Sequence, residues 1–220
     1  MKRIGLLLLA AILFFSSCVE REHTIYIYAT TDVHGNYIGE NSLSNVKSYV
    51  DLKRAEYGEK SVFLIDNGDH LQGTNAAYYF NFKDTTGGKH LFTRVMENIG
   101  YDAVVMGNHD IEAGHPVYDK VDAEMSIPYL AANAISEETG RPYFQEYAII
   151  KKGGVKVAVI GFQNPNISQW LAYSLWEGIK FVPTYPMTDS LVIVVRQRET
   201  TDLVVISVHG GIGTADEHKV

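Results

Sequence analysis

The sequence predicts an α/β fold in which buried strands alternate with helices around a mixed sheet. Four apolar runs of strand length, at 25–31, 62–65, 103–106 and 203–208, each stop at a turn of polar residues or glycine. The segments between the first three runs are long enough to form strand-helix-strand units. The turn Lys152–Gly154 joins two further apolar runs as a hairpin, so the sheet is expected to be mixed rather than purely parallel.

The expected elements follow from apolar periodicity and from glycine stops. Gly58 and Gly100 are expected to end two of the helices. The apolar run Leu191–Val195 is assigned to a helix, although its β-branched residues favour a strand. The strands are expected at 24–31, 61–65, 102–106, 129–132, 143–151, 155–162 and 203–208, and the helices at 46–57, 91–99, 116–125 and 186–200.

Composition fits one globular domain and argues against a nucleic-acid polymer as partner. The 220 residues are 46% hydrophobic and 20% charged, which is enough chain for one substantial core. The formal net charge is −7 and no basic tract occurs, so a polyanion would be repelled in general. A small anionic substrate remains compatible with this charge, because bound cations would invert the local field.

The first residues have the layout of a secretory signal. Lys2 and Arg3 precede the apolar stretch Ile4–Phe15, which is short for a membrane span, and two serines then lead to Cys18. This arrangement resembles the bacterial lipoprotein signal, although Phe15 stands where leucine is more usual. We expect residues 1–18 to form this signal, with Cys18 as the lipidation site. The mature protein would then be exported to the periplasm or cell surface and held at the membrane by its lipid anchor alone.

Polar residues follow the ends of the predicted strands and suggest a metal site. Parallel strands place their carboxyl ends at one edge of a sheet, so Asp32, His34, Asp69 and Asn108 are expected to converge there, together with His209. In extended backbone Asp32 and His34 would face the same side and bind one cation, while Asp69 could bridge two. These oxygen and nitrogen donors, without thiolate, suit two divalent ions such as Mn, Zn, Fe or Co. Two such ions support phosphoryl transfer.

Four motifs in this order resemble the calcineurin-like metallophosphoesterase family. They are Asp32-x-His34, Gly68-Asp69, Gly107-Asn108-His109-Asp110 and His209-Gly210. The longer string 66–73 and the pair Gly161-Phe162 are similar to the exported 5′-nucleotidase and 2′,3′-cyclic-nucleotide phosphodiesterase branch. The resemblance covers residues 24–220 and implies a four-layer α/β/β/α sandwich with mixed sheets, incomplete at its C-terminus.

The resemblance also implies a role for each matching residue. Asp32 and His34 would bind the first metal, Asn108 and His209 the second, and Asp69 would bridge them. Asn108 and His109 would contact the substrate, a nucleotide or other small phosphoester, which family members attack with metal-bound hydroxide. His109 would be the general acid, oriented by either Asp110 or Glu112, between which the sequence does not decide.

One departure from the family pattern concerns the metal ligands. The family completes both metal shells with a later Gly-His-x-His pair, and the sequence ends at Val220 without it; His218 follows His209 too closely to replace it. The expectation is therefore a truncated phosphoesterase that binds metal weakly and hydrolyses slowly or not at all.

Other readings of the sequence remain open. The alternative function, from another class, is a non-catalytic surface lipoprotein that binds a metal or a solute. His70 and His115 are expected to be surface histidines or to lie behind the metal ligands. Trp170 and Trp176 could stack on a nucleobase, but core packing is the favoured interpretation.

Overall fold

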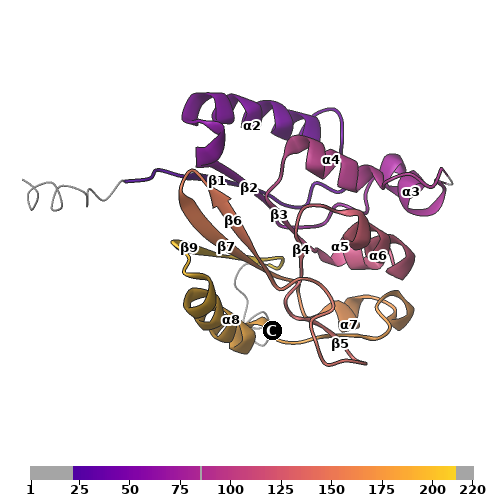
Figure 1. The fold of residues 1–220 in the computed structure, drawn as a ribbon. Helices are drawn as coiled ribbons and strands as arrows, with labels where there is room; N and C mark the ends of the chain where they lie inside the picture. Colours follow the sequence, from indigo (N-terminus) through magenta and orange to yellow (C-terminus); the bar gives the residue numbers. More distant parts are fainter. Residues whose placement is uncertain (1–21, 85, 212–220) are drawn as a thin grey trace, which may run out of the picture.

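Two sheets packed face to face, with helices on both outer faces, form the four layers of the molecule (Figure 1). The computed structural model describes residues 22–84 and 86–211. From one side to the other, helices α2 (Leu43–Tyr57) and α4 (Leu91–Ile99) come first, then the two sheets, then α8 (Thr184–Glu199). This arrangement confirms the predicted α/β/β/α sandwich. The expected signal segment and Cys18 lie outside the described residues, so the lipid anchor stays a prediction. Among the described residues, no helix is long and apolar enough to cross a membrane.

The first sheet is fully parallel, in the order β1-β2-β3-β4. Its central strand β2 is buried along its whole length, as the continuous apolar run predicted. Helices connect successive strands, so the carboxyl ends of the strands meet at one edge. The strands are β1 (Tyr26–Thr30), β2 (Val62–Asp66), β3 (Ala103–Val105) and β4 (Tyr129–Leu130); α6 (His115–Glu124) links the last two.

The second sheet is mixed. It contains the strand that ends before His209, the fourth of the strands that are followed by predicted site residues. Strands β6 (Tyr147–Lys152) and β7 (Val155–Phe162) form the expected antiparallel hairpin. Gly153 and Gly154 both have positive φ, as a two-residue hairpin turn of type I′ requires. Strand β9 (Leu203–Val208) then pairs in parallel with β7. The sheet is therefore mixed, as predicted.

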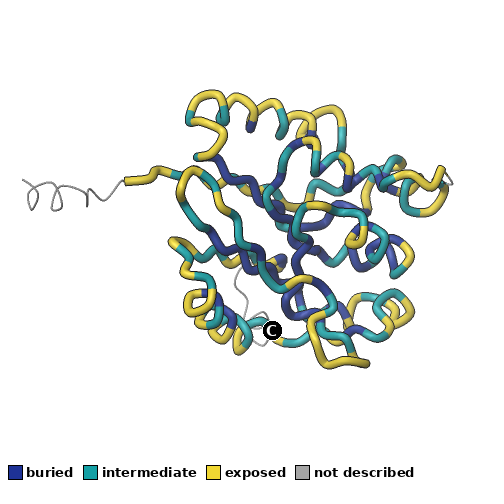
Figure 2. Tube along the Cα trace, in the orientation of Figure 1, coloured by how far each residue is buried: buried dark blue, intermediate teal, exposed yellow. Residues whose placement is uncertain are grey.

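The two sheets approach closely because Gly161 has no side chain. A Cβ at Gly161 would lie 2.4 Å from the Cβ of Leu130, within the neighbouring sheet. Around this contact, apolar side chains of both sheets form one buried cluster, which includes Phe63, Val105 and Val159. Figure 2 shows the buried strands at the centre and the exposed faces of the helices outside.

The helix at 184–199 was predicted correctly despite its β-branched residues. Leu191 and Val195, four residues apart, lie on one face and pack with Ile160 and Phe162 of β7. Burial of this stripe therefore outweighs the local preference for a strand.

Several short elements were not predicted. Helix α3 (Asn75–Phe82) buries Ala77 but leaves Tyr78, Tyr79 and Phe82 exposed, so it has no apolar stripe for the sequence to reveal. Its N-terminus is instead fixed by the Thr74 hydroxyl, which accepts a hydrogen bond from the Ala77 N–H at 3.2 Å. The other missed elements are α5 (Asn108–Glu112), α7 (Ile167–Trp170), the 3-10 turns Glu59–Ser61 and Tyr173–Leu175, and the two-stranded sheet β5 (Ala134–Ser136) with β8 (Ile179–Phe181).

Acid is expected to destabilise the fold through His90. This buried residue caps α4, where its Nδ1 accepts a hydrogen bond from the Phe92 N–H at 3.2 Å. Burial and, next, the charge of Lys120 lower the pKa of His90 to about 4. The unfolded chain, with an ordinary histidine pKa of about 6.5, therefore takes up the proton first as the pH falls. Stability present above pH 6.5 is lost as the pH falls towards 4, by on the order of 3 kcal/mol.

The substitution His90→Asn keeps a capping side chain but removes this titration. Urea unfolding of the metal-free protein at pH 7 and pH 4.5 should show a smaller acid loss in His90→Asn than in the wild type. The matched control is His23→Asn, because His23 is exposed. An acid loss in His90→Asn as large as in the wild type would contradict this prediction.

Candidate metal centre and active site

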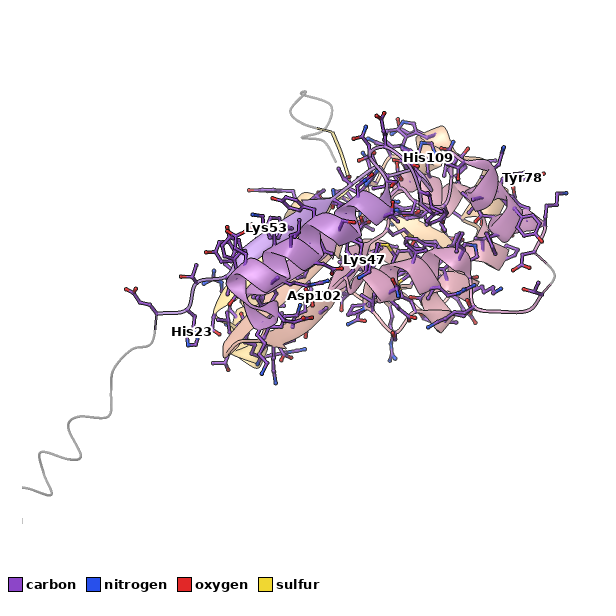
Figure 3. The ribbon with its side chains drawn as sticks, turned by 90° about the horizontal axis from the view of Figure 1, so that it is seen from above. His23, Lys47, Lys53, Tyr78, Asp102 and His109 are labelled. Atoms are coloured by element: carbon purple, nitrogen blue, oxygen red, sulfur yellow. The ribbon has the colours of Figure 1, made fainter. Side chains whose placement is uncertain are left out.

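The predicted donors converge at the carboxyl ends of β1, β2, β3 and β9. Two groups of side chains each offer ligand atoms within 4.8 Å of one another. One group contains His34, Asp69 and His109, and the other contains Asp32, Asp69 and His209. Figure 3 labels His109 among the side chains of this end of the molecule. Asp69 belongs to both groups, which is the position that a bridging carboxylate would need.

Asp69 is buried and held by its neighbours in a strained conformation. Its φ of 65° lies in the left-handed region, which non-glycine residues adopt rarely and often at functional sites. One carboxylate oxygen accepts a hydrogen bond from the His109 N–H at 2.8 Å, and the other lies 3.4 Å from His209 Nε2. Gly107 makes this possible, because a Cβ there would lie 2.1 Å from Asp69 Oδ1.

A buried pair behind Asp69 fixes the turn that carries it. Asp66 accepts a hydrogen bond from the Gly68 N–H at 2.8 Å, and the same oxygen lies 2.6 Å from His70 Nε2. Both side chains are fully buried. Burial acts to lower the pKa of His70, but the charge and hydrogen bond of Asp66, together with the charges of Asp110 and Asp69, raise that pKa above its usual value. His70 therefore lies behind the site and not on the surface, which decides between the two expectations for it.

The two acidic residues left open as partners of His109 occupy different places. Glu112 lies one helical turn after His109 on α5, and its carboxylate is 2.5 Å from His109 Nδ1. Asp110 is instead fully buried and accepts hydrogen bonds from four backbone N–H groups, those of Asp69, His70, Leu71 and Gly107. Burial, and then the charge of Asp69, raise the pKa of Asp110. Asp110 thus orders the loops around Asp69, and Glu112 contacts the imidazole.

The prediction that Asp32 and His34 face the same side in extended backbone is wrong, because this segment is not extended. Strand β1 ends at Thr30, and Asp32 and His34 have φ values of 54° and 51°. The two side chains consequently belong to different donor groups, although both reach Asp69. His34 Nδ1 is buried and has no hydrogen-bond partner among the described residues. A buried nitrogen without a partner is costly, so it fits a metal ligand.

His209 is positioned by Asn67, a residue that the sequence did not single out. The Asn67 carbonyl oxygen lies 2.6 Å from His209 Nδ1, which leaves Nε2 facing Asp69 and Asn108. The Asn67 amide also donates to the Val208 carbonyl at 3.0 Å and so joins β2 to β9. Burial lowers the pKa of His209, but the hydrogen bond and charge of Asp69 raise it to about 9. A cation at Nε2 would therefore displace a proton.

Asn108 lies where it was expected, between His209 and an open cavity. Its Oδ1 is 3.2 Å from His209 Nε2. The cavity has a volume of about 260 Å³. Its described lining residues are Thr31, Asp32, Asn67, Asn108, Asn164, Trp170, His209, Gly210 and Gly211. The core packing favoured for Trp170 is wrong, because its side chain is exposed at this cavity.

His115 and Trp176, by contrast, have structural surroundings. His115 lies 3.1 Å from Asp119 and 2.9 Å from the Glu177 carbonyl, away from the donor groups. The Trp176 indole donates to the Leu171 carbonyl and packs against Phe181.

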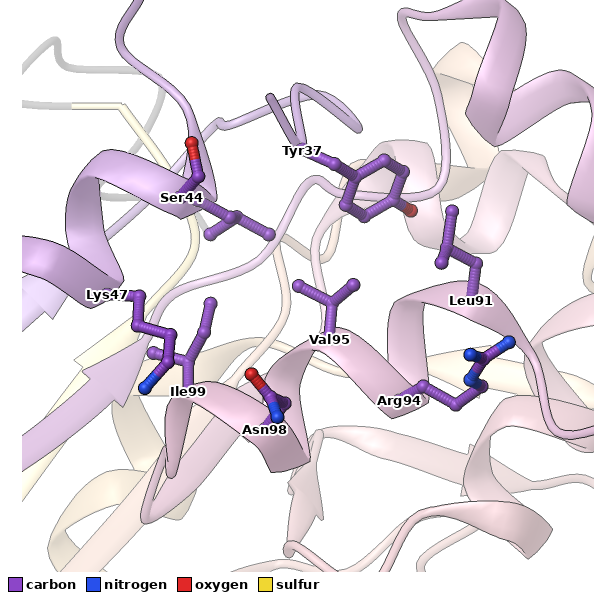
Figure 4. A pocket seen from close by; sticks show the side chains of 9 residues that line it. Tyr37, Ser44, Lys47, Leu91, Arg94, Val95, Asn98 and Ile99 are labelled. Atoms are coloured by element: carbon purple, nitrogen blue, oxygen red, sulfur yellow. The ribbon is translucent and has the colours of Figure 1, made fainter. Parts of the chain in front are cut away.

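A second cavity, of about 370 Å³, lies between α2 and α4 (Figure 4). Leucine, valine and isoleucine form much of its wall, and Lys47 and Arg94 lie at its edge. None of the predicted site residues lines it, and neither donor group contributes to it. The chemistry therefore belongs to the strand ends and not to the larger cavity.

A four-layer sandwich with oxygen and nitrogen donors clustered at its strand ends fits a metal-dependent hydrolase. The sequence profile described as calcineurin-like phosphoesterase matches residues 25–218. The chain therefore belongs to the calcineurin-like phosphoesterase family, a family of hydrolases, and the resemblance seen in its motifs is confirmed.

Relatives with assigned activities are similar over nearly the whole chain. The chain is 28% identical to a 5′-nucleotidase of Vibrio cholerae serotype O1, over 91% of this chain and 36% of that protein. It is 26% identical to a 2′,3′-cyclic-nucleotide 2′-phosphodiesterase/3′-nucleotidase of Yersinia enterocolitica, over 98% of this chain and 36% of that protein. The chain thus spans about a third of the length of these relatives.

Solved structures share the fold at lower identity. The calcineurin-like phosphoesterase YfkN from Bacillus subtilis superposes with a TM-score of 0.75 at 24% identity, over 86% of this chain and 63% of that chain. A 5′-nucleotidase precursor from Thermus thermophilus superposes with a TM-score of 0.69 at 18% identity, over 84% of this chain and 37% of that chain.

Proposed function

We propose that this protein is a metal-dependent phosphoesterase that hydrolyses nucleotide phosphoesters. The observation that carries the proposal is Asp69, a buried carboxylate shared by two groups of potential metal ligands. The named relatives are 5′-nucleotidases and a cyclic-nucleotide phosphodiesterase, which supports nucleotides as the substrate class.

In this proposal two divalent ions are held by five side chains. By the family resemblance, Asp32 and His34 would hold the first ion, Asn108 and His209 the second, and Asp69 would contribute to both, although the structure groups Asp32 with His209 and His34 with His109 around Asp69. The ligand atoms are oxygen and nitrogen, which fits Mn, Zn, Fe or Co. When bound, the ions would lower the pKa of a water molecule and offset the charge of the phosphate.

His109 supplies the proton to the leaving oxygen. The Glu112 carboxylate lies 2.5 Å from Nδ1 and orients the ring, while Nε2 lies 4.0 Å from Asp69 Oδ2 and faces the donor groups. Its position on α5 beside Asn108, the side chain proposed to contact the phosphate, supports this role. Asp110 takes no part in proton transfer, because its oxygens already accept backbone hydrogen bonds.

The proposal predicts hydrolysis that depends on a divalent metal. The metal-free protein is supplied with Mn²⁺ or Zn²⁺, and phosphate release is followed with 5′-AMP and 3′-AMP, and diester opening with 2′,3′-cyclic AMP. We expect slow turnover of at least one ester, lost on addition of a chelator and restored by the metal. Metal binding without turnover of any of these esters, by this chain or by a longer form that carries a Gly-His-x-His pair, would instead support a metal-binding lipoprotein.

We also propose that the protein acts outside the cytoplasmic membrane, anchored by lipid at Cys18. The charged, apolar and small-residue layout of residues 1–18 supports this. Incorporation of a labelled fatty acid that is lost in Cys18→Ser would test the anchor.

A further inference from the structure

One wall of the cavity beside the donor groups is an indole. Among its described lining residues, Trp170 has the one large apolar ring, and the others are polar residues or glycine. Trp170 is the last residue of α7, and 53% of it is exposed. No hydrogen bond or ring contact with another described residue fixes its indole. Its exposure at the cavity is therefore not accounted for by packing.

The loop that leads to Trp170 is anchored to the core. Buried Asn133 donates its amide to the Gln163 carbonyl at 2.7 Å and accepts a hydrogen bond from the Gln163 N–H at 2.9 Å. The side chain of Gln163 in turn accepts from the Asn164 N–H, and that of Asn164 accepts from the Asn166 N–H, at 2.7 and 2.9 Å. This chain of hydrogen bonds runs from the core to the start of α7. The indole is thus presented by a built loop.

The size and lining of the cavity indicate different surroundings for the phosphoryl group and the organic group of a substrate. Its volume of about 260 Å³ is below the roughly 300–1,000 Å³ usual for sites that enclose drug-sized ligands. The polar part, where Asp32, Asn108 and His209 would hold the proposed ions, would receive the phosphoryl group. The organic group must then extend beyond this part, along the wall that the exposed indole of Trp170 forms.

We infer that Trp170 receives the organic group of the phosphoester by stacking, so that the site prefers esters of planar aromatic groups to esters of small alcohols. This inference rests on the proposed function, because it concerns the same cavity. Base stacking on an aromatic side chain contributes about ten-fold or more to affinity.

The first test compares two esters of different organic groups. In the metal-loaded protein, Trp170→Ala should raise KM for 5′-AMP by about ten-fold or more and leave KM for methyl phosphate within about two-fold. The value of kcat should change little for either ester, since the indole does not reach the reacting atoms. The matched control is Tyr173→Ala, because Tyr173 is 51% exposed, lies three residues away and does not line the cavity. An equal effect on both esters would overturn the inference.

The second test needs no turnover, because the chain has two tryptophans. In Trp176→Phe the remaining fluorescence, excited at 295 nm to avoid the nucleobase, comes from Trp170. With Zn²⁺ bound, 5′-AMP should quench it saturably, and inorganic phosphate should not. Trp170→Phe, which keeps Trp176, should respond to neither. If Trp176→Phe fails to fold, the difference between the wild type and Trp170→Phe gives the same signal.

The two tests separate the inference from the proposed function. A wild type that hydrolyses none of 5′-AMP, 3′-AMP and 2′,3′-cyclic AMP contradicts the proposed function, and Trp170 is then judged by fluorescence alone. Saturable quenching by 5′-AMP but not by phosphate supports the aromatic subsite in either case. Absence of quenching, or equal quenching by phosphate, overturns it.

Discussion

Replacement of Asp69 by asparagine is expected to weaken metal binding by at least about 100-fold and to abolish hydrolysis. Loss of a residue behind a metal ligand already costs about 10–100-fold in affinity, and Asp69 is itself a donor in both groups. Asparagine keeps the size of the side chain and one oxygen, but removes the charge that both ions would share. The measurement is isothermal titration of the metal-free protein with Mn²⁺.

The matched control for Asp69→Asn is Asp51→Asn. Asp51 lies on α2, exposed, in an ion pair with Lys47 that contributes little to stability. Asp51→Asn should bind Mn²⁺ as the wild type does. Circular dichroism should show that both variants keep the native secondary structure. A folded Asp69→Asn variant with an affinity within about three-fold of the wild type would contradict the shared-carboxylate site.

The sequence was sufficient to predict which strand ends meet, because strand order follows from simple connection rules. Apolar runs that stop at Asp32, Asp69 and Asn108 needed only a parallel arrangement to converge. His209 follows β9 of the second sheet, so its approach to Asp69 depends on the packing of the two sheets. The hairpin at Gly153 and Gly154 was predicted from its turn residues instead.

The local conformation of the site could not be predicted in this way. The left-handed backbone at Asp32, His34 and Asp69 depends on contacts with distant segments. An example is Asp110, which binds the N–H groups of residues about 40 positions earlier in the chain. The role of Asn67 likewise depends on a contact with β9, more than 140 residues later. Sequence periodicity carries no signal for such hydrogen bonds, although Asn67 lies inside a motif that had been singled out.

Replacement of His109 by glutamine should lower kcat by about 10²–10⁴-fold for a nucleotide, and much less for a nitrophenyl ester. A nucleoside oxygen leaves as an unstable alkoxide unless it is protonated, whereas nitrophenolate leaves without a proton. Glutamine cannot donate a proton of comparable acidity, but it fits the space of the imidazole and keeps the backbone N–H that binds Asp69.

His109 also lies in one of the donor groups, so it could act as a metal ligand instead of a general acid. Measurement of the metal content distinguishes these two roles. If His109 is the acid, His109→Gln should retain the metal stoichiometry of the wild type, measured by atomic emission after dialysis. Glu112→Gln should lower kcat less than His109→Gln does, and again more for the nucleotide than for the nitrophenyl ester. This substitution removes the carboxylate beside Nδ1 and not the acid itself. An equal loss of kcat for both kinds of ester, or loss of one metal equivalent, would show that His109 acts as a ligand instead.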